Sequence, residues 1–334
     1  MRARLATICG NCVSEGGPKV TQRKTKKGIS TPTGHRPVML DAALDALQIK
    51  PQGCYVDATF GRGGHSRAVL ACLGEEGRLV AFDRDPEALA AGLVLADSDH
   101  RFAMQRCNFA DLADQLPARS VDGILFDFGV SSPQLDQAER GFSFMRDGPL
   151  DMRMDPEHGL SAAQWLAQVP ETELVEAFTT LGEEKFARRI ARAVVARRSE
   201  QPFTRTVELA DFIASVLPRN YDGIHPATRA FQAIRIVVNA ELSAISRGLD
   251  AAYDLLAPQA RLVAISFHSL EDRLVKQFIQ SRSRGPQGSR RLPPPEAAPA
   301  PTLRDLGKRR ADEQEILDNP RSRSAVLRCA ERVQ

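Results

Sequence analysis

The sequence lacks a strong excess of charge of either sign. Its 45 Lys and Arg face 42 Asp and Glu among 334 residues, for a formal net charge of +3. Any nucleic-acid site must therefore come from local basic patches rather than from bulk charge. Aromatic residues are also scarce, with one Trp and three Tyr, which argues against a surface that stacks many bases. The composition, 43% hydrophobic and 26% charged, excludes collagen-like, fully disordered and coiled-coil chains.

Cysteines and long apolar runs are sparse as well. The six cysteines are too widely spread for a disulfide framework, which indicates a reducing compartment. Cys9 and Cys12 have a zinc-like spacing but neither a second pair nor a nearby His, so we expect no metal. No apolar run approaches the ~20 residues of a membrane span, and Leu5–Cys9 is too short for a secretory signal. We therefore expect a cytoplasmic protein that does not enter a membrane.

The chain begins with a basic segment and then changes character. Residues 1–30 hold seven Lys and Arg against one acid and show no apolar periodicity, which predicts a disordered extension over 1–34. From about residue 35, short apolar runs alternate with helical spacing. The runs predicted as strands are 54–59, 78–82, 102–105 and 121–126, with helices at 66–73 and 86–95 between them. This alternation predicts an α/β fold with a doubly wound parallel sheet.

The alternation stops after Asp136. From 137 to 225 helical signals dominate, and in one helix Ile190 and Val194 mark an apolar face opposite a basic one. That basic face is either solvated or available to phosphates. A long helix is expected from Pro226 to Leu249 and a further strand at 261–266, while six prolines indicate a loop at 281–303. The predicted domains are the extension 1–34, a core in two parts, 35–136 and 226–334, and a helical insertion at 137–225. The basic segments are 1–30, 185–198 and 304–332.

The first motif that carries chemistry is a glycine-rich loop. It reads Asp57-Ala-Thr-Phe-Gly61-Arg-Gly63-Gly64-His65, and Asp83 follows at the end of the next strand. Glycines let the backbone approach a ligand closely, and an acid at the second strand's end binds ribose hydroxyls. A nicotinamide fingerprint would need a third glycine where Ser66 stands. The pattern favours an S-adenosylmethionine-dependent methyltransferase over a dinucleotide enzyme.

The second motif is Asp127-Phe-Gly-Val-Ser-Ser-Pro133, placed where the fourth strand leaves the sheet. Ligands bind at that edge in open α/β folds. Amino-methyltransferases hold an exocyclic amino group here with an acidic or amide residue, prolines and an aromatic ring. This segment has one proline and no aromatic residue after it, so by itself it supports amino-methylation only weakly.

Longer segments resemble one family closely. The sequence is similar to the ribosomal RNA small subunit methyltransferase H family, also called MraW, from about His35 to the C-terminus. The segments that carry the resemblance are Gly61-Arg-Gly-Gly-His-Ser66, Asp83-Arg-Asp-Pro86, Gly129-Val-Ser-Ser-Pro-Gln-Leu-Asp136, the run from Glu139 to Asp155, His225-Pro-Ala-Thr-Arg229, Ser266-Phe-His-Ser-Leu-Glu-Asp-Arg273 and Asn319-Pro-Arg-Ser-Arg-Ser324.

The resemblance implies a function and a donor site. The implied reaction is N4-methylation of a cytidine in 16S rRNA of the small ribosomal subunit, at the position usually numbered 1402, with S-adenosylmethionine as methyl donor. The implied fold is a Rossmann-like methyltransferase core interrupted by a helical domain. The family's donor site maps onto Gly63, Gly64, His65, Asp83, Phe109, Asp127 and Gln134. Phe128 stands where the family commonly has Leu, which changes an apolar wall and removes no polar group.

Catalysis in such a site depends mainly on positioning. We expect Asp127 to accept a hydrogen bond from the cytosine amino group, assisted by Ser131 or Ser132; the alternative is that Asp127 only shapes the donor pocket. His268 either lines the substrate entrance or caps the next helix. Arg140, Arg146 and Arg153 are candidate contacts to RNA phosphates. The alternative function is an RNA-binding ribosome-assembly factor with a non-catalytic donor pocket, and a DNA amino-methyltransferase is disfavoured.

Overall fold

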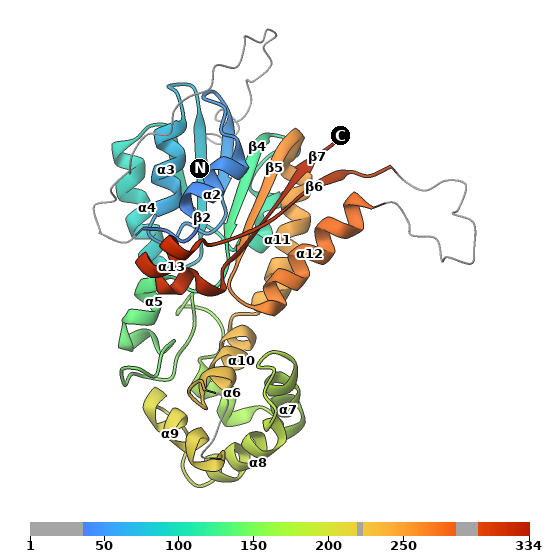
Figure 1. The fold of residues 1–334 in the computed structure, drawn as a ribbon. Coiled ribbons are helices and arrows are strands. Elements are labelled where there is room, and N and C mark those ends of the chain that lie inside the picture. Colours follow the sequence, from blue (N-terminus) through green and yellow to red (C-terminus); the bar gives the residue numbers. More distant parts are fainter. Residues whose placement is uncertain (1–35, 219–222, 285–299) are drawn as a thin grey trace, which may run out of the picture. The chain divides into compact units, whose positions relative to one another are not determined.

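The computed structural model describes residues 36–218, 223–284 and 300–334, which form two compact units (Figure 1). Unit 1 comprises the chain up to Gly129 and from Ala244 onward, and unit 2 is Val130–Ser243. Unit 2 extends beyond the predicted insertion, 137–225, at both ends. The predicted extension, 1–34, and most of the Pro-rich loop, 281–303, lie outside the described residues.

Unit 1 is built on a seven-stranded sheet of order β3-β2-β1-β4-β5-β7-β6. The strands are β1 (Cys54–Asp57), β2 (Arg78–Asp83), β3 (Phe102–Arg106), β4 (Val121–Asp127), β5 (Leu256–Ser266), β6 (Leu303–Arg310) and β7 (Val326–Arg332). The first five in sheet order pair in parallel, whereas β7 is antiparallel to both β5 and β6. The predicted α/β class with a doubly wound sheet is confirmed.

Helices cover both faces of this sheet. Those of unit 1 are α2 (Leu40–Leu47), α3 (Gly64–Cys72), α4 (Pro86–Ser98), α12 (Ser269–Ser283), α13 (Glu313–Asp318) and most of α11 (Glu241–Leu255). Leu327 of β7 belongs to the core shared with α2, α3 and α4, whereas its neighbour Arg328 is paired with Asp272 of α12. Because successive strand residues point to opposite faces, α12 covers the face opposite α2.

The parallel strands end at one edge of the sheet. β4, Val121–Asp127, is buried through most of its length, as expected for an apolar strand covered on both faces. Asp57, Asp83 and Asp127 are the last residues of β1, β2 and β4. Neighbouring parallel strands therefore bring three carboxylates to the edge where ligands bind in such folds.

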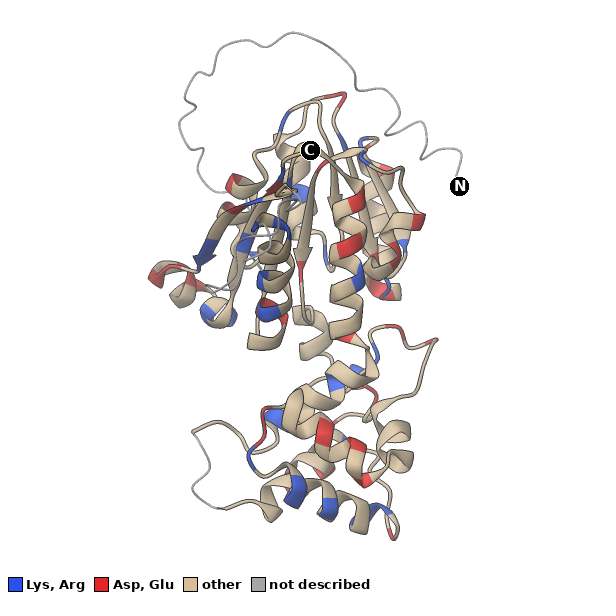
Figure 2. Ribbon diagram, turned by 90° about the vertical axis from the view of Figure 1, so that its right-hand side faces the viewer, with Lys and Arg blue, Asp and Glu red and all other residues tan. Residues whose placement is uncertain are grey.

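Two features of the fold differ from the sequence prediction. The predicted helix from Pro226 to Leu249 is wrong: it is divided into α10 (Thr228–Val238) and α11, because Ala240 adopts a left-handed φ of 49° between them. Strand β6 was not predicted, because its residues from Arg304 to Arg310 are all exposed and show no apolar alternation. Lys and Arg occupy the last residues of this strand, at the left of Figure 2.

Unit 2 is helical and has a core of its own. Its elements are α5 (Ser132–Asp136), the 3-10 turn η2 (Ala138–Arg140), α6 (Ala162–Gln168), α7 (Glu171–Thr180), α8 (Ala187–Arg198), α9 (Thr206–Val216) and α10. Ile190 and Val194 of α8 are fully buried in this core, which confirms the apolar face predicted for that helix, while Arg188, Arg189 and Arg192 are exposed. Over the described residues, the helices are too short or too polar to cross a membrane.

Candidate active site

The loop between β1 and α3 depends on glycine at several positions. Gly61 and Gly63 have left-handed φ values of 56° and 73°, a region that glycine enters without steric cost. A Cβ at Gly63 would lie 2.5 Å from Cζ of Phe60, and one at Gly64 would lie 2.3 Å from Cγ of Pro37. The glycines are thus required by the loop's own packing, and the loop leads directly into the N-terminus of α3.

Asp57 is hydrogen-bonded to both ends of this loop. Its side chain is 2% exposed; Oδ2 accepts a 2.6 Å hydrogen bond from the Ser66 hydroxyl, and Oδ1 accepts one of 3.2 Å from the Thr59 amide. Burial raises the pKa of Asp57 to about 6. Thr59 Oγ1 in turn accepts a 2.7 Å hydrogen bond from the Asp127 amide. This chain of hydrogen bonds fixes the ends of β1 and β4 relative to each other.

Asp83, the predicted ribose-binding residue, is anchored to the same loop. Its Oδ2 accepts a hydrogen bond of 2.8 Å from the Gly61 amide, and Oδ1 accepts one of 2.9 Å from the Asp85 amide. Burial raises the pKa of Asp83 in spite of these two bonds. Each carboxylate oxygen has a second lone pair, so the residue retains capacity to accept hydrogen bonds from two adjacent hydroxyls.

Asp127 and His65 face each other at the end of β4. The distance from His65 Nδ1 to Asp127 Oδ2 is 3.7 Å. His65 Nε2 lies 3.2 Å from the Val38 carbonyl, which can only accept, so Nε2 carries the hydrogen and Nδ1 presents its lone pair to Asp127. Burial lowers the pKa of His65 to about 4, and the imidazole is therefore neutral at physiological pH.

The carboxyl group of Asp127 has an unusual environment. The side chain is 26% exposed, yet its Oδ1 atom is buried and accepts no hydrogen bond from any described residue. Burial, followed by the neighbouring carboxylates Asp57 and Glu271, raises the pKa of Asp127 well above its ordinary value. Asp127 thus combines a pKa raised well above its ordinary value with a buried Oδ1 atom that has no hydrogen-bond partner among the described residues.

Glu271 is the site residue that sequence reasoning missed. Its side chain is fully buried, and Oε2 accepts hydrogen bonds from the amides of Phe267 (2.7 Å) and His268 (3.3 Å). A Cβ on Gly129 would lie 3.8 Å from Glu271 Oε1. The available signal was the spacing His268-Ser-Leu-Glu271, which is that of a capping box. His268 is indeed the N-cap of α12, the second of its two predicted roles.

Phe109 lies in a cluster of aromatic rings. It begins the 3-10 turn η1 (Phe109–Asp114) after β3, and its ring centroid is 5.7 Å from that of Phe126 and 5.8 Å from that of Phe128. A Cβ on Gly248 would lie 2.6 Å from Phe109 Cδ2, so α11 approaches this ring closely. Phe128, where Leu is common in the family, stacks on Phe126 at 5.2 Å and is buried.

Ser131, Ser132 and Gln134 belong to unit 2. Ser131 and Gln134 form a capping box at the start of α5, in which the Ser131 amide donates a 2.9 Å hydrogen bond to Gln134 Oε1. Gln134 is 6% exposed and Ser132 is half-buried. The amide oxygen of Gln134 therefore has a structural partner, and the predicted roles of these three residues remain predictions.

The three arginines predicted to contact phosphates also have internal partners. Arg140 donates to the carbonyls of Arg153 and Met154, and Arg146 donates to the carbonyl of Asp136. Arg153 forms an ion pair of 2.7 Å with Asp151. These guanidinium groups hold loops of unit 2 together, so their contact with RNA also stays a prediction.

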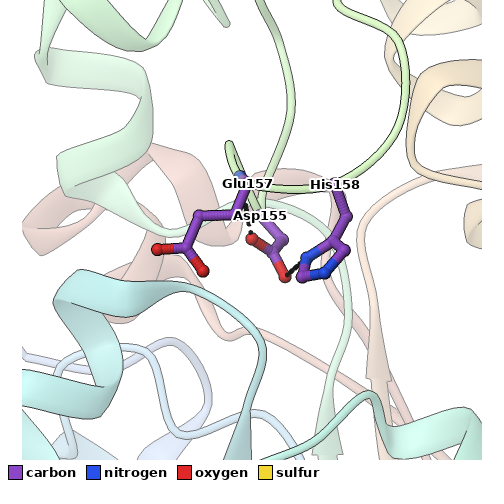
Figure 3. Close-up of side chains that lie close together, drawn as sticks. All are labelled: Asp155, Glu157 and His158. Atoms are coloured by element: carbon purple, nitrogen blue, oxygen red, sulfur yellow. Dashed lines mark hydrogen bonds and ion pairs between the residues drawn. The ribbon is translucent and has the colours of Figure 1, made fainter.

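One cluster of possible metal ligands stands on its own in unit 2. Asp155, Glu157 and His158 lie side by side (Figure 3), with Asp155 Oδ2 3.0 Å from His158 Nδ1. Asp155 Oδ1 accepts a 3.1 Å hydrogen bond from the Glu157 amide. The His158 side chain is 77% exposed. The carboxylate of Asp155 thus closes a surface turn, which accounts for the cluster without a ligand.

Comparison with known proteins identifies relatives of this chain. A family model described as the MraW methylase family matches residues 32–333. Two proteins named ribosomal RNA small subunit methyltransferase H are similar to it. That of Xanthomonas euvesicatoria is 56% identical over 90% of this chain and 90% of the relative, and that of Xanthomonas oryzae is 55% identical over 91% and 90%.

Likeness to solved structures is looser. A rRNA methylase from Streptococcus thermophilus is 12% identical with a TM-score of 0.38, over 92% of this chain and 100% of that one. The assignment therefore rests on the sequence matches, which extend over nearly the whole chain. The chain belongs to the MraW methylase family.

Proposed function

We propose that this protein transfers the methyl group of S-adenosylmethionine to N4 of a cytidine in 16S rRNA of the small ribosomal subunit. The observation that carries the proposal is Asp127, a carboxylate at the carboxyl end of β4 with a raised pKa and a buried Oδ1 atom that no described residue bonds. It stands beside a glycine loop and Asp83, in a member of the MraW family. Such a substrate agrees with the cytoplasmic location expected from the sequence.

The donor half of the proposal follows from the loop and Asp83. Gly63 and Gly64 lead the backbone into the start of α3, where helix amides attract negative charge such as a carboxylate. Asp83 retains lone pairs for ribose hydroxyls. Phe109 offers an apolar ring to the adenine. The sulfonium supplies an already activated methyl group, so the task of the protein is alignment.

Asp127 acts on the acceptor. The lone pair of a cytosine amino nitrogen is delocalised into the ring, which makes it a poor nucleophile. Asp127 accepts a hydrogen bond from one N4 hydrogen and so favours the geometry in which the nitrogen attacks. It then takes that proton as the C–N bond forms and the C–S bond breaks. Its raised pKa increases its affinity for this proton, and Ser131 or Ser132 assists by orienting the base.

Product analysis tests the function. The full-length protein is incubated with donor labelled in the methyl group and with 30S particles, naked 16S rRNA or DNA, and the modified nucleoside is identified after digestion. We expect labelled N4-methylcytidine from an rRNA-containing substrate. A protein that binds the donor without transferring the label would instead be the assembly factor, and label in DNA alone would overturn the RNA assignment.

A further inference from the structure

Strand β6 is the outer strand of the sheet, hydrogen-bonded to β7 on one side. From Arg304 to Arg310 every residue is exposed. The strand carries a bulge between Asp305 and Lys308, where Gly307 has a φ of 92°. Exposed edge strands are open to pairing with other chains, and a bulge with a run of basic residues prevents that pairing. The exposed side chains of this edge are therefore available to a partner of another kind.

The basic residues at the end of β6 are largely uncompensated. The side chains of Lys308 and Arg310 are exposed and form no ion pair or hydrogen bond with another described residue. Between them, Arg309 is paired with Asp45 of α2, and both side chains are mostly exposed. Cationic side chains without a partner in the protein can neutralise phosphates. This releases the counterions condensed on the nucleic acid, which favours binding.

These residues lie on the face that α12 covers. Lys308 is directly opposite Arg328 and Arg310 is opposite Val326 in the β6–β7 register, and Arg328 reaches Asp272 of α12. Helix α12 packs against β6 and adds the exposed Lys276. We call Lys276, Lys308 and Arg310 the β6 strip.

The register of the sheet fixes how far the end of β6 lies from the proposed catalytic residue. Asp127 pairs with Ile265, Ile265 with Leu327, and Leu327 with Arg309. Neighbouring strands are about 4.8 Å apart, so three steps place the backbone of Arg309 about 14 Å from that of Asp127. The end of β6 and the end of β4 thus occupy the same edge of one rigid sheet, within the span of a few nucleotides.

We propose that the β6 strip binds the phosphate backbone of the single-stranded RNA that flanks the target cytidine. The inference rests on the proposed function, since it assigns the path of that substrate. Phosphate contacts position a nucleic acid without reading its sequence, and a base extruded toward Asp127 needs its flanking strand held nearby. The exposed arginines of α8 are also basic, but they belong to unit 2, whereas the β6 strip shares its sheet with Asp127.

The test is a double variant of the full-length protein that removes two positive charges, Lys308→Gln with Arg310→Gln. Its matched control is Lys50→Gln with Arg304→Gln, which removes the same charge from exposed positions nearer the opposite edge; Glu331, the partner of Arg304, keeps Arg261 at 2.9 Å. For each protein, KM and kcat for 30S particles are measured at several salt concentrations, with donor affinity by titration calorimetry and mass by light scattering.

We expect the double variant to raise KM for the particle about tenfold and to reduce the slope of log KM against log salt by about 1.4, for two lost phosphate contacts to a single strand. Its donor affinity and kcat stay within twofold of wild type, and the control behaves as wild type. Equal KM and salt slope in both double variants would overturn the inference, as would a change in oligomeric mass with unchanged KM, which would assign the edge to a second copy. Failure of wild type to methylate any RNA would instead overturn the proposed function.

Discussion

The residues at the carboxyl ends of β1, β2 and β4 show how three aspartates of one sheet edge acquire different tasks. The carboxylate oxygens of Asp57 and Asp83 accept hydrogen bonds from the amides and the hydroxyl that shape the glycine loop. Asp127 receives no such bond at Oδ1 and has two carboxylates nearby. Burial and like charges both disfavour its ionised form, which suits the proton-accepting role proposed for it.

The first prediction concerns Asp127→Asn. The variant cannot take the N4 proton, so kcat falls by about 100-fold or more, while the affinity for the donor changes little. The control is Asp122→Asn, on the same strand at its other end, where the carboxylate is paired with Lys50 at 2.8 Å. Single-turnover methylation measures kcat. Asp127→Asn with more than a third of wild-type kcat would leave Asp127 only a pocket-shaping role.

The same residue gives a pH dependence with a defined sign. Asp127 accepts a proton only when ionised, and its pKa is raised, so wild-type kcat falls as pH falls through a value above the ordinary range for Asp. His65, with a pKa of about 4, stays neutral in that range and does not contribute. In Asp127→Asn the residual kcat no longer falls as the pH is lowered through this range. A wild-type profile with no acid limb above the ordinary pKa range of Asp would contradict the assignment.

At the scale of the element, the strand–loop–helix unit from β1 to α3 carries the proposed donor site. Its geometry combines left-handed glycines with contacts that exclude a side chain at Gly63, 2.5 Å from the Phe60 ring. Such contacts leave the loop little freedom to adapt, because side chains and backbone are both close-packed. A rigid loop positions its amides before the ligand arrives, which reduces the entropy lost on binding.

The prediction at this scale is that Gly63→Ala weakens donor binding by at least about tenfold, which corresponds to a loss of about 1.4 kcal/mol of binding free energy. The control is Gly159→Ala: Gly159 also has a left-handed φ, 77°, but a Cβ there meets nothing within 4 Å. Both variants carry backbone strain of roughly 1–2 kcal/mol, so thermal stability falls in both. Titration calorimetry then separates them, and equal donor affinities would show that the loop adapts.

For the whole molecule, the insertion is a second folded unit rather than a long loop. Unit 1 and unit 2 each contain their own set of buried apolar side chains. The chain leaves unit 1 immediately after Gly129, two residues beyond Asp127, and returns at Ala244. An insertion that starts directly after β4 begins next to the catalytic edge, which is where added segments alter substrate choice in α/β enzymes.

Two cavity variants test this division. Leu174, in the core of unit 2, and Leu79, in the core of unit 1, are both essentially unexposed. Each Leu→Ala change should reduce the free energy of unfolding of its own unit by about 2–5 kcal/mol. Because a ligand stabilises the unit that binds it, added donor raises the calorimetric transition lowered by Leu79→Ala and not the one lowered by Leu174→Ala. One transition that moves equally in both variants would contradict the division.

The sequence by itself determined the parts of this protein whose signals are local. Five strands, the glycine loop, Asp83 and Asp127 follow from apolar runs that end in turns and acids, because hydrophobic periodicity and glycine both act over a few residues. The same local logic identified the apolar face of α8 and the family resemblance. It also placed two alternatives at His268, of which the structure selects the helix cap.

The tertiary structure decided what depends on distant segments. Strand β6 has no apolar alternation and exists only through its pairing with β7. The break at Ala240 divides a continuous apolar stripe that the sequence favours as one helix. Glu271 lies 144 positions from Asp127 in the chain, yet its charge raises the pKa of Asp127. Burial and electrostatics act through space rather than along the chain, and only the folded sheet brings these groups together.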